Sequence, residues 1–309
     1  MSSRRPTMNI KGDNAKDDCV IFLHIPKSAG TTFGQILQHC YGKAGMEWIV
    51  SQGSVPLETT IQNLSVDRKR KISALVGHFD YGVHRLLPKP AHYVTFVRHP
   101  VDRILSHYYY VLRTPHHYLH QQIISGRIDL AAYVSGNITE ELENGQTRMI
   151  AGRGINCSDA EMLRKALDNI DRHFSCVGTA ERFVDSLLLM AHQNGWAHPY
   201  FRDANVGSNK PLRTEISNEV IRVIESRNAV DMELYHFAQQ RLEQQLQATL
   251  PDWESRKRRF LIGNRQYAHA ANLRSNLSKC FSVCRPKPTE DVRIKSKQPH
   301  RSSSPDILL

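Results

Sequence analysis

Three clusters of polar residues could bind and transfer an anionic group, and the first is a small-residue loop that directly follows the apolar run 19–24. Its candidate phosphate ligands are Lys27, Ser28, Gly30, Thr31 and Thr32. Such a loop binds anions because backbone N–H groups and the helix dipole favour negative charge, to which a lysine adds its own positive charge. The glycine allows close backbone approach, and the threonine hydroxyls can cap the helix or donate to a phosphate.

The nearest motif to this loop is the Walker A sequence, which has the order Gly-x-x-x-x-Gly-Lys-Ser/Thr. The order here differs, because Lys27 precedes Gly30 and no glycine stands at the opening position. An ordinary strand-to-helix turn with a solvated lysine is the other interpretation. Taken alone, the loop is compatible with both that turn and an anion site.

The second cluster begins with Arg98, at the end of another apolar run. Ser106 follows eight residues later, about two helical turns, so its hydroxyl can face a phosphate that the guanidinium pairs with bidentately. A surface ion pair between Arg98 and Asp102 is the competing interpretation, worth under about 1 kcal/mol. The third cluster centres on His78, which also follows a short apolar run.

The elements that must position these clusters are strands alternating with helices. Apolar runs rich in β-forming residues predict buried strands at 19–24, 74–78, 92–98 and 174–178. The alternation indicates an α/β fold, with a central parallel sheet flanked by helices and a P-loop-like strand–loop–helix at the first cluster. Ligands of such sheets bind beyond the carboxyl ends of the strands, where all three clusters lie.

The charge of the chain is concentrated at one end. The 309 residues carry a net charge of +11, but residues 253–309 hold thirteen Lys and Arg against four acids, which leaves +9 there. We therefore expect a disordered N-terminus (1–18), a catalytic domain (19–252) and a basic, largely disordered C-terminal tail (253–309). Because the folded body lacks a basic footprint, no nucleic acid is expected as a partner.

No apolar segment has the length of a signal sequence or a membrane span, which predicts a soluble, cytoplasmic protein with no membrane span. The six cysteines form no CxxC pair, so reduced thiols are expected. The Cys and His spacing completes no zinc motif, and no metal site is expected.

Several segments together resemble a known family. Residues 22–33, which read FLHIPKSAGTTF, are similar to the 5′-phosphosulfate loop of carbohydrate sulfotransferases that use 3′-phosphoadenosine 5′-phosphosulfate (PAPS). Residues 93–108 resemble the family's 3′-phosphate segment, and residues 76–79 its catalytic-histidine segment. Residues 144–148 and 177–183 also look like family sequence. The resemblance covers roughly 19–240 and is closest to heparan sulfate 2-O- and 6-O-sulfotransferases and bacterial relatives.

The resemblance implies roles for the three clusters. Lys27 would contact the bridging oxygen and 5′-phosphate of PAPS, and the rest of the loop would cradle that phosphate. Arg98 and Ser106 would hold the 3′-phosphate, with Lys210 as a further ligand from the segment 205–210. His78 would be the general base that takes the proton of the acceptor hydroxyl. The acceptor would be a carbohydrate or another hydroxyl-bearing molecule, 3′-phosphoadenosine 5′-phosphate (PAP) the product, and no metal is required.

Two departures from the family pattern stand out. The loop reads Lys-Ser-Ala-Gly where the family more often has Lys-Thr-Gly-Gly or Lys-Thr-Ala-Gly, and Ser28 keeps a hydroxyl. His99 stands where the family usually has aspartate, between Arg98 and Pro100. This removes a carboxylate beside the arginine and puts in doubt any pair that the carboxylate makes.

Two other classes of function are compatible with parts of the sequence. A P-loop-type phosphotransferase would use Asp80, after the second strand, as a magnesium ligand, but the order of the loop argues against it. A non-catalytic binder of anionic polymers would carry its basic residues on the folded body, whereas here they lie in 253–309.

Overall fold

The computed structural model describes residues 18–50, 55–152, 157–202 and 213–283, with side chains to residue 273. The strands are β1 (Cys19–Leu23), β2 (Met46–Ile49), β3 (Ala74–Gly77), β4 (Ala91–Val97) and β5 (Phe174–Thr179). They form one parallel sheet with the order β2-β3-β1-β4-β5. The predicted α/β class with a central parallel sheet is confirmed.

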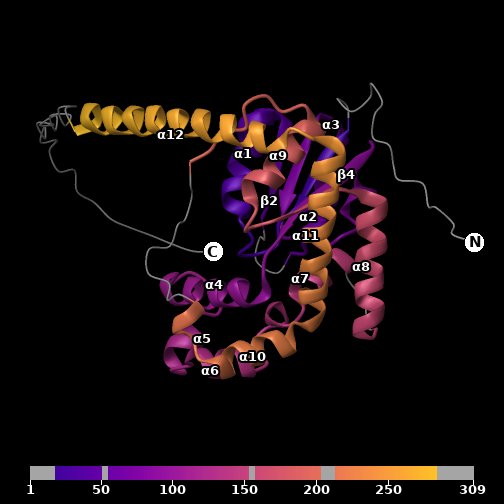
Figure 1. Ribbon diagram of the computed structural model, residues 1–309, viewed down its shortest axis with the longest axis vertical. Coiled ribbons are helices and arrows are strands. Elements are labelled where there is room, and N and C mark those ends of the chain that lie inside the picture. The colour runs from indigo at the N-terminus through magenta and orange to yellow at the C-terminus, as the bar shows by residue number, and fades with distance from the viewer. Residues whose placement is uncertain (1–17, 51–54, 153–156, 203–212, 284–309) are drawn as a thin grey trace, which may run out of the picture. The chain divides into compact units, whose positions relative to one another are not determined.

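Helices surround this sheet (Figure 1). They are α1 (Gly30–Gly45), α2 (Leu57–Asn63), α3 (Val66–Lys71), α4 (Pro100–Arg113), α5 (His120–Ser125), α6 (Leu130–Ser135), α7 (Gly145–Ala151), α8 (Asp159–His173), α9 (Phe183–Asn194), α10 (Asn218–Arg227), α11 (Ala229–Thr249) and α12 (Trp253–Val283). Short 3₁₀ turns are η1 (Val83–Leu86), η2 (Glu140–Leu142) and η3 (Arg213–Glu215). Within the described ranges, no helix is both long and apolar enough to cross a bilayer.

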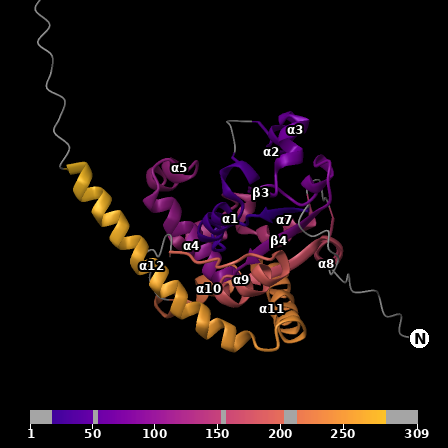
Figure 2. The same cartoon turned by 90° about the horizontal axis from the view of Figure 1, so that it is seen from above.

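Alternating side chains of the strands divide the core into two layers. In β1, Ile21 and Leu23 face a cluster formed with α2, α7, α8 and the first turns of α11. Val20 and Phe22 face the opposite cluster, formed with α1, α9 and the later turns of α11. Because β1 lies between β3 and β4 and is covered on both faces, all of its residues are buried and apolar. Figure 2 shows the same fold from above.

A third apolar cluster lies outside these layers and joins α4, α5, α6 and α10. It packs the apolar face of α4, including Val101, Ile104 and Val111, which are almost fully buried. The cluster anchors α4 at the end of β4, so residues of both elements are held at the carboxyl edge of the sheet.

Strand β2 was not predicted, because its sequence, Met-Glu-Trp-Ile, lacks the long apolar run of the other strands. It is an edge strand that pairs only with β3, and Trp48 is 39% exposed. Arg68 on α3 stabilises this edge by donating to the carboxylate of Glu47 at 2.7 Å and to the carbonyl of Met46 at 2.6 Å. Such tertiary contacts cannot be read from a four-residue segment.

The expectation of a largely disordered tail is wrong for its first part, because residues 253–283 form α12. Residues up to Ala268 belong to the same compact unit as the sheet, and His269–Leu309 form a second unit. Phe260 is buried in the same layer as α1 and α9. Lys257 pairs with Asp185 at 2.8 Å, and Asn264 accepts the N–H of Phe201 at 2.7 Å. The basic composition of this segment gave no indication of these contacts, because long charged side chains can surround one buried aromatic ring.

This packing predicts a sharp difference between two neighbouring residues of α12. Phe260→Ala should lower the free energy of unfolding by about 3 kcal/mol, because it removes a buried ring and leaves a cavity. Leu261→Ala should change it by less than about 0.5 kcal/mol, since Leu261 is 45% exposed. Equilibrium denaturation in urea measures both values. Equal, small effects would show that α12 does not pack on the domain.

Candidate active site

The loop between β1 and α1 has an unusual backbone. Lys27 and Ala29 both lie in the left-handed region, with φ of 67° and 65°. This conformation is unfavourable for residues with a Cβ atom, and strained residues of this kind cluster at ligand sites. Ala29 is the N-cap of α1 and provides no side-chain cap. A helix start without a side-chain cap can present its first N–H groups to an anion.

His24 packs over the start of α1 and explains why Gly30 has no side chain. A Cβ atom at Gly30 would lie 1.8 Å from the imidazole ring of His24. The ring is buried, and burial, reinforced by the charges of His78 and Lys27, lowers the pKa of His24 to about 2. His24 is therefore neutral and adds no positive charge to the loop.

His78 follows the carboxyl end of β3 and is an exposed residue, and one face of its ring stacks on His24 with centroids 4.1 Å apart. Its Nδ1 lies 2.7 Å from the backbone oxygen of His24. A carbonyl oxygen only accepts hydrogen bonds, so Nδ1 carries the proton and Nε2 of the neutral ring has a free lone pair. This is the tautomer that a general base requires.

Desolvation by the surrounding protein atoms lowers the pKa of the His78 imidazole. The hydrogen bond to the carbonyl of His24 and the negative charge of Glu141 act in the opposite direction, and the positive charge of Lys27 lowers the pKa again. Since desolvation by the surrounding protein dominates, the imidazole is neutral at pH 7 and able to accept a proton.

Lys27 and Arg98 join the same site from two other strands. The ammonium group of Lys27 lies 3.6 Å from the ring centroid of Tyr110, on α4, in a cation–π contact. Arg98, directly after β4, donates from Nη1 to the backbone oxygen of Lys27 at 3.2 Å. The three predicted clusters therefore converge, because His78 and Arg98 both bond to carbonyls of the segment that follows β1.

The remaining predicted ligands are distributed around this loop. Ser28 is 1% exposed, and its hydroxyl has no hydrogen-bond partner among the described residues. Thr32 is buried in the first turn of α1, whereas Thr31 is exposed. Ser106 is buried on α4, two turns after the start of that helix. Lys210 lies outside the described residues.

Arg98 keeps hydrogen-bonding capacity for a ligand. Its Nη1 bonds the carbonyl of Lys27, and its backbone N–H and C=O pair with the side chain of Gln146. Within the part of the chain that the structure describes, its Nε and Nη2 groups have no protein partner. A guanidinium with unused N–H groups beside an uncapped helix start is suited to bind a phosphate.

Sequence reasoning gave no role to three residues that shape the site. The ring of Tyr110 contacts the ammonium group of Lys27. His24 supports the ring of His78 by stacking against it. Gln146 lies in the family-like segment 144–148, and that resemblance was the only signal for it.

His99, which replaces the usual aspartate, lies at the N-cap of α4. Its backbone N–H donates to Glu181 at 3.0 Å, and its Nε2 lies 3.5 Å from Nη1 of Arg213. Burial and the nearby charge of Arg213 lower the pKa of His99. The bond from Arg98 to the loop is present without the carboxylate.

No group of three or more His, Cys, Asp or Glu side chains within the described ranges is arranged to hold a metal ion.

Comparison with known proteins identifies the family. Residues 13–177, more than half of the chain, match the sequence model of the sulfotransferase family. These residues contain β1, β3 and β4 with the three clusters at their carboxyl ends. The chain therefore belongs to the sulfotransferase family.

Several individual proteins are similar to most of this chain. Heparan-sulfate 6-O-sulfotransferase 2 of Mus musculus is 25% identical over 286 residues, which cover 76% of this chain and 45% of the relative. The Danio rerio protein of the same name is 24% identical over 295 residues, with 79% and 61% covered. Heparan-sulfate 6-O-sulfotransferase 1 of Gallus gallus is 23% identical, with 73% and 66% covered. The chain thus spans about half to two thirds of the length of these relatives.

The contact between His24 and the helix start predicts that Gly30 is sensitive to substitution. Gly30→Ala should displace the His24 ring, disturb its stack with His78 and lower the free energy of unfolding by about 2 kcal/mol. Gly45→Ala, at the other end of α1, is the control, because its nearest contact would be an ordinary 3.6 Å. Urea denaturation and the NMR shifts of the His78 ring measure the two effects. A Gly30→Ala protein as stable as the wild type, with an unmoved His78 signal, would contradict this account.

Proposed function

We propose that this chain transfers the sulfuryl group of PAPS to a hydroxyl group, most simply that of a carbohydrate. The observation that carries the proposal is the convergence of three strand ends: His78 and Arg98 are both hydrogen-bonded to carbonyls of the segment that contains Lys27. One site thereby combines a neutral imidazole, a guanidinium and an ammonium group. Membership of the sulfotransferase family supports the same conclusion.

The residues present fit the donor PAPS. The hydroxyl of Ser28, which has no hydrogen-bond partner among the described residues, and the start of α1, which has no side-chain cap, suit the 5′-phosphosulfate. We assign that end of the donor to Lys27, Ser28, Gly30, Thr31 and Thr32. Arg98 would hold the 3′-phosphate through its unused N–H groups, together with Ser106 and Lys210. No metal ion is needed, because lysine and backbone donors supply the positive potential.

The transfer follows from the roles of His78 and Lys27. Nε2 of His78 accepts the proton of the acceptor hydroxyl as its oxygen forms a bond to sulfur. The bond between sulfur and the bridging oxygen breaks on the opposite side, and the electron pair leaves with the 5′-phosphate of PAP. The ammonium group of Lys27 stabilises that developing charge. Tyr110 restrains Lys27 beside the loop, which limits the positions that this group can occupy.

The acceptor is proposed from the relatives alone. Their names describe 6-O-sulfation of heparan sulfate. We therefore propose an oligosaccharide or polysaccharide hydroxyl as the acceptor of this chain.

Donor recognition can be tested by isothermal titration with PAP, AMP and ATP. We expect PAP to bind more tightly than AMP, because only PAP has a 3′-phosphate for Arg98. Arg98→Ala should weaken PAP binding by at least about thirtyfold and leave AMP nearly unchanged, since charge-assisted hydrogen bonds are lost. Arg164→Ala, an exposed arginine on α8, is the matched control. Equal binding of PAP and AMP by the wild type would overturn the proposal and favour a phosphotransferase.

The base is tested by the rate of sulfuryl transfer and its dependence on pH. His78→Ala should lower kcat by about 10²- to 10⁴-fold without changing PAP affinity, and exposed His39→Ala should have little effect. Because desolvation by the surrounding protein lowers the pKa of His78, the base form persists below the ordinary value of about 6.5. The kcat/KM of the wild type should therefore fall only at a pH lower than that value. Full activity in His78→Ala would exclude this residue as the base.

A further inference from the structure

The peptide groups of Arg98 are held on both sides by one side chain. The backbone N–H of Arg98 donates to Oε1 of Gln146 at 2.8 Å, and Nε2 of Gln146 donates to the backbone oxygen of Arg98 at 2.9 Å. Gln146 is fully buried. Its amide therefore satisfies both polar backbone groups of the residue that follows β4.

We call this pair of hydrogen bonds between the Gln146 amide and the backbone of Arg98 the Gln146 clamp. The position of Arg98 in the fold explains why the clamp matters. The last ladder bond of the preceding strand is made by Val97, whose carbonyl accepts from Ala180 at 2.9 Å. Two residues beyond Arg98, Pro100 begins α4. Arg98 thus occupies the corner between a strand and a helix, where neither element supplies partners for its backbone. The amide of Gln146 replaces them and fixes the direction in which the side chain leaves the chain.

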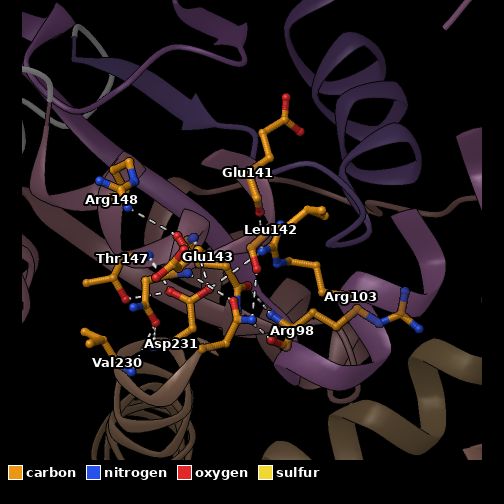
Figure 3. A network of polar contacts seen from close by, with 12 residues as sticks. Arg98, Arg103, Glu141, Leu142, Glu143, Thr147, Arg148, Val230 and Asp231 are labelled. Carbon is orange, nitrogen blue, oxygen red and sulfur yellow. Dashed lines mark hydrogen bonds and ion pairs between the residues drawn. The ribbon is translucent and has the colours of Figure 1, made fainter. Parts of the chain in front are cut away.

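Gln146 is itself held by a buried carboxylate. Asp231, in the first turn of α11, accepts the N–H of Gln146 at 3.2 Å, and the N–H and hydroxyl of Thr147 at 2.8 and 2.7 Å. In return, Oδ1 of Asn144 accepts the N–H groups of Val230 and Asp231, each at 3.2 Å. The two helix N-termini cap each other, as Figure 3 shows for Thr147, Val230 and Asp231.

Arg103 completes the network from α4. Its Nη2 lies 3.8 Å from Oδ2 of Asp231 and donates to the backbone oxygen of Glu141 at 2.7 Å. Both charged side chains are buried, with 1% and 0% exposed. Arg98 and Arg103 belong to neighbouring segments, so the network links the start of α4 to α7 and α11 (Figure 3). Nε of Arg103 has no hydrogen-bond partner among the described residues, but the other bonds of this buried network restrain the segments that it joins.

We infer that Gln146 is a positioning residue of the donor site, which orients the guanidinium of Arg98 toward the 3′-phosphate through the reciprocal bonds to its backbone. The inference rests on the proposed function, because Arg98 meets a 3′-phosphate only if PAPS is the donor. Because Gln146 is fully buried, it would touch neither donor nor acceptor. Its contribution should therefore appear in recognition of the 3′-phosphate and nowhere else.

The test uses Gln146→Met, which keeps the shape of the side chain and removes both bonds to Arg98. We expect PAP affinity to fall by about tenfold and AMP affinity to stay within twofold. In the Arg98→Ala background, Gln146→Met should change PAP affinity no further. Gln245→Met is the matched control. Gln245 also donates to a backbone carbonyl, that of Ser175, but this carbonyl lies at the amino end of β5, whereas the candidate site lies at the carboxyl ends of the strands.

The outcomes separate this inference from the proposed function. If the wild type does not prefer PAP over AMP, the proposed function fails. If the wild type prefers PAP and Gln146→Met keeps the full preference, the positioning role fails. Equal losses for PAP and AMP would indicate a general structural role and would also overturn the inference.

A second measurement needs no variant and decides the question if Gln146→Met does not fold. In the wild type, the amide hydrogen of Arg98 should exchange with solvent as slowly as those inside β4, because Gln146 accepts its hydrogen bond. Exchange at the rate of a solvated loop would show that the clamp is not formed and would overturn the inference.

Discussion

The buried carboxylate of Asp231 is the interaction on which the arrangement at the edge of the sheet depends. An unpaired carboxylate in a protein interior is strongly unfavourable. Here it accepts three hydrogen bonds from the first turn of α7, lies at the start of α11 and faces the guanidinium of Arg103. Two positive helix ends and one cation meet one anion. Segments more than 80 residues apart are thereby fixed against each other.

Hydrogen bonds to backbone groups connect this buried network to the candidate active site. Gln146 connects the capped start of α7 to the peptide groups of Arg98, and Arg98 bonds the carbonyl of Lys27. The carbonyl of His24, three residues earlier, accepts from His78. Because main-chain atoms carry these links, they survive the replacement of the family's aspartate by His99. The same links keep the ammonium, guanidinium and imidazole groups in one site.

The electrostatics of the site follow from burial. His24 stays neutral because burial lowers its pKa to about 2, so it supports His78 without adding a charge beside Lys27. The free lone pair on Nε2 of His78 results from the hydrogen bond on the other ring nitrogen. A site with a neutral imidazole and two cations suits the anionic donor and the neutral hydroxyl acceptor that we propose.

The sequence by itself determined the α/β class, four of the strands and the polar clusters at three strand ends, because buried parallel strands are continuous apolar runs and the clusters follow them directly. It could not reveal β2 or the packing of Phe260, since a four-residue edge strand and a basic helix owe their places to contacts with distant residues. The tautomer of His78, the support from His24 and the clamp of Gln146 were decided only by the tertiary structure. Each depends on a hydrogen bond or ring contact between segments far apart in the chain, which no local pattern of residues encodes.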